Sequence, residues 1–117
     1  MNDHQIEEEI QAKGLTAPRV TPADVEGAIA SEWYINGGDA QADDFQPPVP
    51  AASPLRLLTF CVLVLKNGFT VTGESACASR ENYNQELGRK IARQNAVQKI
   101  WPLLGFRLRD RISDGLE

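Results

Sequence analysis

The sequence has few residues of the kinds that build catalytic and metal sites. It contains one histidine, His4, and two cysteines, Cys61 and Cys77, among 117 residues. Three such side chains at these positions cannot form a structural zinc site. The chain has no Gly-x-Ser-x-Gly motif and no evident pair of catalytic carboxylates. We therefore expect a protein that is not an enzyme and that has no cofactor or metal.

Long apolar runs are also lacking. The longest, at residues 57–65, is far shorter than the roughly 20 residues that cross a bilayer as a helix. The acidic start of the chain does not resemble a signal peptide. We expect a cytoplasmic protein without a membrane partner, in which Cys61 and Cys77 are buried free thiols.

Acidic and basic side chains are separated along the chain. Residues 1–54 contain ten acids and two bases, whereas residues 55–117 contain ten bases and six acids. From Arg89 to Arg111 there are seven bases and one acid, Asp110. This strip suits an anionic partner, although the net charge of −4 and the acidic first half disfavour a large polyanion such as DNA.

The segment 57–101 organises the rest of the chain. Residues 57–65 are almost all apolar, which predicts a strand covered on both faces. Asn67-Gly68 predicts a hairpin with a type I′ turn, in which both central residues have positive φ. The alternation that follows predicts a second strand. We therefore expect strands at about 57–66 and 69–74.

Small residues at 73–79 precede a predicted long helix at about 80–104, for which Ser79, Asn82 or Asn84 is the cap. At helical spacing, Asn95 and Gln98 fall on its apolar face. Such amides either bond the strand backbone or each other, or they recognise the hydrogen-bonding edge of a ligand.

The end of this helix combines several different signals. Val97, Ile100 and Trp101 lie on a second side, which predicts a second covering surface and hence a homo-oligomer. Pro102 predicts a kink after Trp101, and Gly105 predicts a stop. Residues 106–112 alternate apolar and charged side chains and form either a short strand or a last helical turn.

The first half predicts two helices and a linker. We expect helices at about 3–13, capped by Asp3, and at 22–34, where Thr21-Pro22 begins a helix that buries Val25, Ile29 and Trp33. Residues 37–54 are rich in Gly, Asp and Pro and predict a linker. The expected organisation is a helical segment at 1–36, the linker, and a core at 55–117. The expected class is α+β, with a short antiparallel sheet packed by helices on one face.

Several motifs resemble a family of small tailed-phage and prophage proteins, known from lytic coliphages and lambdoid Shigella phages. They are GLTAPRVTP at 14–22, LKNGFTV at 65–71, GESAC at 73–77 and GRKIA at 88–92, followed by NA at 95–96 and KIWP at 99–102. The resemblance implies a phage genome context and a place in the host cytoplasm. The hairpin-and-helix plan is also similar to that of phage anti-defence proteins that bind nucleotide messengers without cleaving them.

We expect a non-enzymatic binder of a small anionic, nucleotide-like ligand that counters host defence. The candidate ligand-binding residues carry hydroxyls, amides or positive charge: Ser75, Ser79, Arg89, Lys90, Arg93, Asn95, Gln98, Arg107, Arg109 and Arg111. Phe69, Tyr83 or Phe106 could stack on a base. The alternatives are a nucleic-acid-binding accessory that uses the strip 89–111 and a module that inhibits a host protein. The arginines could also form a solvated face whose ion pairs contribute only about 0–1 kcal/mol each.

Overall fold

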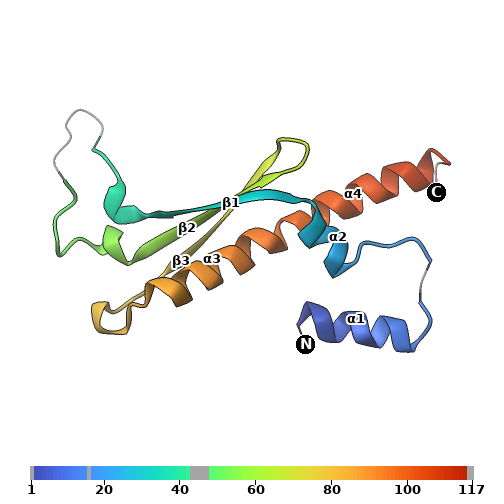
Figure 1. Cartoon of the computed structure of the whole chain (residues 1–117), viewed down its shortest axis with the longest axis horizontal. Helices are drawn as coiled ribbons and strands as arrows, with labels where there is room; N and C mark the ends of the chain where they lie inside the picture. The colour runs from blue at the N-terminus through green and yellow to red at the C-terminus, as the bar shows by residue number, and fades with distance from the viewer. Residues whose placement is uncertain (1, 16, 43–47, 116–117) are drawn as a thin grey trace.

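The protein is an α+β structure built on one three-stranded antiparallel sheet, which confirms the expected class. The computed structural model describes residues 2–15, 17–42 and 48–115. The strands β1 (Ile29–Asn36), β2 (Leu58–Leu65) and β3 (Thr70–Ala76) lie in the order β1-β2-β3. Helix α3 (Gln85–Gln98) runs along the sheet, and α4 (Ile100–Ser113) continues beyond it (Figure 1). The molecule measures 55 × 31 × 17 Å.

The hairpin between β2 and β3 forms where it is predicted, but its turn is of another type. Gly68 has φ of 89°, and among the described residues no non-glycine residue has positive φ. The Leu65 amide donates to the Phe69 carbonyl (2.8 Å), and the Gly68 amide donates to the Leu65 carbonyl (2.9 Å). These bonds enclose a three-residue loop that needs only one left-handed residue. The predicted type I′ turn, with Asn67 also left-handed, is therefore wrong.

The predicted helix at 22–34 is wrong after its first two turns. Thr21 and Asp24 form the expected capping box, but α2 (Pro22–Gly27) is short and buries only Val25 among its own residues. The chain then forms β1, which pairs with β2 along its length. A buried apolar strand needs neighbours for its backbone groups, and the β-branched and aromatic residues of 29–35 suit a strand. Trp33 is 61% exposed rather than buried.

The predicted helix at 80–104 is two helices. Residues Arg80–Asn82 form a short 3-10 helix, η3, and α3 begins after Asn84, whose side chain accepts the Leu87 amide. α3 ends at Gln98 because Pro102 has no amide hydrogen for the Gln98 carbonyl. The break thus precedes Trp101 instead of following it. Gly105 does not end α4, and residues 106–112 are helical.

One face of the sheet packs closely on α3. An added Cβ on Gly73 would lie 2.3 Å from both the Ala92 carbonyl oxygen and the Ala96 amide nitrogen. This approach places the core between α3 and the sheet, with Cys61 and Leu63 at its centre. Within the described chain no element covers the other face of β2, so the prediction of a strand covered on both faces is wrong for the single chain.

The second apolar side of the C-terminal helices is covered by the chain itself. Val97 and Ile100 belong to the core together with Val25 of α2, and Ile100 is fully buried. The reason given above for expecting an oligomer therefore does not hold. Both cysteines are free, as predicted, although Cys77 is only half-buried.

The first helix is attached mainly by polar contacts. α1 (Asp3–Ala12) has no buried residue, and its cap is Asn2 rather than Asp3. The Asp3 carboxylate instead accepts hydrogen bonds from Gln98 and Trp101 (3.2 Å each). The predicted linker contains η1 (Gly37–Asp39) and leads into η2 (Pro54–Leu57). Its residues 43–47 lie outside the described part of the chain.

Candidate functional site

The predicted cations of α3 are held by neighbouring acids and an aromatic ring. The Arg93 guanidinium contacts Glu26 of α2 (2.8 Å) and Glu32 of β1 (2.6 Å). These bonds raise the pKa of Arg93 and lower that of Glu26. Lys90 lies 3.4 Å from Glu86, and the Arg89 guanidinium carbon lies 5.2 Å from the centre of the Tyr34 ring. These three cations fasten α3 to the sheet and to its own first turn.

The two predicted amides also have partners within the chain. Asn95 donates to the Glu74 carbonyl of β3 (2.8 Å). β3 is an edge strand, so this bond satisfies a backbone acceptor that no neighbouring strand pairs. Gln98 donates to Asp3. Asn95 thus bonds the strand backbone, which is one of the two roles considered above, whereas Gln98 bonds a side chain of α1, which neither role included.

The predicted serines lie at the opposite end of the sheet from the C-terminal arginines. Ser79 donates to the Glu81 carboxylate (2.8 Å), and Ser75 is half-buried near the end of β3. Ser75 pairs with Thr59 near the start of β2, whereas Arg107 lies beside residues of the β2–β3 turn. The ten predicted residues therefore do not form one pocket.

A groove of about 900 Å³ is lined by residues of the β2–β3 turn, of α2 with the segment before it, and of α4. It contains two of the predicted residues, Arg107 and Arg111, which are one helical turn apart on α4. Arg109 lies on another side of α4 and does not line the groove. Its apolar lining includes Val20, Leu65, Phe69, Leu103, Leu104 and Leu108. A volume of this size is typical of a small-molecule site.

The rim of the groove is mainly cationic. The basic lining residues are Lys66, Arg107, Arg111 and Arg19, and Asp24 is the one acid among the lining residues. The charge of Arg19 is paired with Glu7 of α1. Phe69 is 56% exposed, so one ring is available to a ligand beside these cations. Neither Lys66 nor Arg107 forms an ion pair with any residue that the structure describes. The groove can therefore contact both an apolar ring and an anion.

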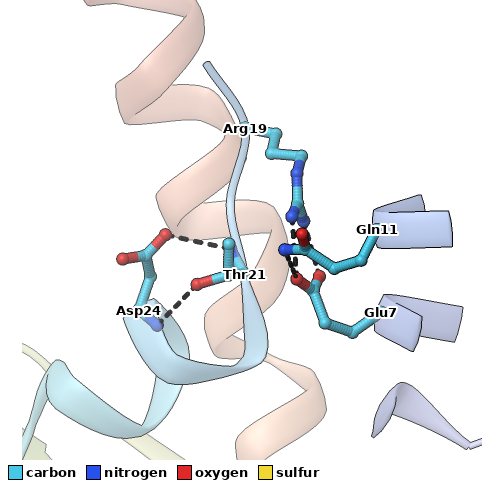
Figure 2. A network of polar contacts seen from close by, with 5 residues as sticks. All are labelled: Glu7, Gln11, Arg19, Thr21 and Asp24. Carbon is cyan, nitrogen blue, oxygen red and sulfur yellow. Dashed lines mark hydrogen bonds and ion pairs between the residues drawn. The ribbon is translucent and has the colours of Figure 1, made fainter. Parts of the chain in front are cut away.

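Arg19 and Asp24 are fixed by the network drawn in Figure 2. The Arg19 guanidinium donates two hydrogen bonds to Glu7 of α1 (2.5 and 2.7 Å). Hydrogen bonds from Arg19 and then Gln11 lower the pKa of Glu7 from 4.5 to about 2. Asp24 accepts the Thr21 amide (2.9 Å), and the Asp24 amide donates to the Thr21 hydroxyl. This network joins α1 to the segment that forms one wall of the groove.

Sequence reasoning missed most of this groove. Lys66 and Arg19 were not among the predicted site residues, and Phe69 was considered only as a stacking ring. The position of Lys66 beside the Asn67-Gly68 turn could have indicated a residue accessible to a ligand, because a turn exposes its side chains. Nothing local in the sequence indicated that this turn lies beside α4.

The described residues include no group of three or more His, Cys, Asp or Glu side chains that could hold a metal ion. None of the helices described has the length and apolarity needed to cross a membrane.

Comparison with known proteins assigns the chain to a protein family. Neither the curated proteins nor the solved structures include a match to this chain. A family model of phage proteins matches residues 20–112, which span all three strands, α2, α3 and most of α4. This match covers well over half of the sequence and confirms the resemblance drawn from its motifs. The chain belongs to the phage protein (N4 Gp49/phage Sf6 gene 66) family.

Proposed function

We propose that this phage protein is a non-enzymatic binder of a small anionic ligand with a flat ring, such as a nucleotide, and that the ligand occupies the groove between the β2–β3 turn, α2 and α4. The observation that carries this proposal is the combination of an apolar lining with a cationic rim. In an infected cell, such binding would withdraw a host signalling nucleotide from its receptor and so counter host defence.

Arg107 of α4 supplies the first contact to the anion. It lines the groove and forms no ion pair with any residue that the structure describes. An arginine binds phosphate through two parallel hydrogen bonds. Lys66, on the turn opposite, adds a second positive charge from the other side of the groove.

Phe69 supplies the contact to the ring. Its side chain is more than half exposed and lines the groove next to Lys66. Stacking of a base on an aromatic side chain contributes about 1–3 kcal/mol to binding. An aromatic ring beside cations is the arrangement that a nucleotide requires, because its base is flat and its phosphates are charged.

Calorimetry with cyclic and linear mono- and dinucleotides tests the proposal. We expect binding by the wild type and a loss of about 1.5–3 kcal/mol in Arg107→Ala, which is roughly 10- to 150-fold in Kd. Phe69→Ala should weaken binding by a similar factor. The matched control is Arg109→Ala, because this arginine lies on the same helix but outside the groove. No heat with any nucleotide would refute the proposal.

The Arg109→Ala control also distinguishes ligand binding in the groove from binding of nucleic acid. A duplex would contact exposed cations on several sides of α4, so Arg109→Ala and Arg107→Ala would then weaken binding equally. Binding to DNA would also fall steeply with salt, roughly by one power of concentration for each phosphate contacted. Equal losses in the two variants would therefore favour the nucleic-acid alternative over the groove.

A further inference from the structure

One face of the sheet is apolar and uncovered by the described chain. Side chains of β1 and β2 alternate between the side of α3 and the opposite side. On the opposite side lie Trp33, Ile35, Leu58, Phe60, Val62 and Val64, which we call the outer sheet face. The register places Trp33 beside Val62 and Ile35 beside Phe60, so the six side chains form one patch.

The composition of this patch is that of a buried surface. Trp33 is 61% and Ile35 48% exposed, and the four outward residues of β2 are only partly covered. An antiparallel strand with one side in water normally alternates apolar and polar residues, but β2 is apolar on both sides. A contiguous exposed apolar patch of this kind marks an interaction site on a soluble protein.

The charges around the patch are compatible with a contact between two identical copies of this face. The other outward residues of the neighbouring strands are Ser31 on β1 and Thr70, Thr72, Glu74 and Ala76 on β3. Only Glu74 is charged, and it lies on the edge strand. Two copies of this face can meet without placing like charges at the centre. A foreign partner, in contrast, would find no charge pattern that selects it.

The size of the patch is sufficient for a dimer. Eight-residue strands with a rise of about 3.3 Å and three strands about 4.8 Å apart give a face of roughly 26 by 14 Å. Two such faces with their protruding side chains bury on the order of 1,000 Å² in total, which is the lower limit for a specific interface.

We propose that a second copy of this chain covers the outer sheet face. The two sheets would pack face to face about 10 Å apart, with α3 of each copy on the outside. Such a two-fold contact is self-complementary, because each copy presents the same patch. Each sheet would then be covered on both sides, as the apolar pattern of β2 requires. The groove lies outside this contact, so the dimer does not depend on the ligand.

Mass measurement over a range of concentrations tests the dimer. We expect wild type at twice the chain mass of 12.9 kDa and Val62→Lys at 12.9 kDa with an unchanged circular dichroism spectrum. The matched control is Leu87→Lys, which changes an apolar residue of α3 that is 55% exposed away from this face. It should remain a dimer. A wild-type monomer at every concentration, or a dimer that Val62→Lys does not weaken, would overturn the proposal.

A second measurement does not depend on the stability of a lysine variant. Trp101→Phe leaves Trp33 as the sole tryptophan. Its emission should shift to the blue and become protected from acrylamide as protein concentration rises, because the second copy covers the ring. If the emission remained typical of an exposed indole at concentrations where the measured mass is doubled, the dimer contact would lie elsewhere. That result would overturn the proposal.

Discussion

Replacing Gly73 by alanine should destabilise the protein more than any other single methyl added to a glycine of the sheet or of α3. Gly73 lies on β3 where α3 crosses the sheet, and the added Cβ would meet two backbone atoms at 2.3 Å. An ordinary contact of this kind is at least about 1 Å longer. Since both neighbours are helix backbone, no side chain can move aside, and α3 must shift as a whole.

The expected cost is about 3 kcal/mol or more, at the upper end of the range for overpacking. A smaller entropy gain from replacing glycine, about 0.4–1 kcal/mol, offsets only part of it. For 117 residues the unfolding entropy is about 0.25 kcal/mol per kelvin, so a loss of 3 kcal/mol lowers Tm by about 12 °C. Thermal and urea unfolding followed by circular dichroism measure both quantities.

Gly105→Ala is the matched control. This glycine lies inside α4, and an added Cβ would have no neighbour within 4 Å. Alanine there should stabilise the protein by about 0.5–1 kcal/mol through helix propensity. If Gly73→Ala lost less than about 1 kcal/mol while Gly105→Ala gained, α3 would not approach the sheet as closely as the structure has it.

Three further predictions concern the ion pairs of α3, the attachment of α1, and the two thiols. Arg93→Met removes the cation between two carboxylates and should lower the free energy of unfolding by about 1–2 kcal/mol, with a smaller loss in molar salt. Urea unfolding measures this loss, and an unchanged free energy would contradict the described ion pairs. The folded-state pKa of Glu7 is lowered to about 2, so its stabilising effect is complete above about pH 4.5 and is lost as pH falls towards 2. Trp101 fluorescence should report this release of α1, and Glu7→Gln should abolish the pH step. Finally, a thiol reagent should modify half-buried Cys77 well before Cys61, whose pKa is raised by burial; equal rates would argue against the described core.

The hairpin and α3 could be predicted because their signals are local. Asn67-Gly68 marks the turn by backbone preference alone, and Asn84 caps the helix within one turn. The type of turn was not predictable in the same way. A three-residue loop and a two-residue loop both place glycine in the left-handed region, and the register of the flanking strands selects between them.

β1 was missed because its two most exposed apolar side chains, Trp33 and Ile35, face away from α3. On the inner side, Ile29 and Tyr34 pack against the core, but the polar Glu32 and Asn36 lie on that side as well. These polar side chains bond other elements, as Asn36 does with the Tyr83 hydroxyl (3.0 Å). A pattern that assigns apolar residues to the core of a single chain cannot identify such a strand.

The distribution of the predicted site residues has a physical cause. An arginine or amide on a helix that packs on a sheet is near strand carbonyls and neighbouring acids, so Arg93 and Asn95 have partners within the chain. Arg107 lies on α4, which extends past the sheet, and it lines the groove without an ion pair to any residue that the structure describes. Residue type alone does not show which of these cations has a partner, because the partners of Arg93 and Asn95 lie on segments far away in the sequence.

The two proposed surfaces use different residues, so substitutions can test each of them without changing the other. The outer sheet face uses apolar side chains of β1 and β2, whereas the groove uses the turn, α2 and α4. A dimer formed through the sheets would carry two independent grooves, since neither groove residue Arg107 nor Phe69 belongs to the contact. Val62→Lys should then yield a monomer that still binds one nucleotide per chain with unchanged Kd. If the monomer lost binding, the ligand site would have to include the second copy, and the groove as described would be incomplete.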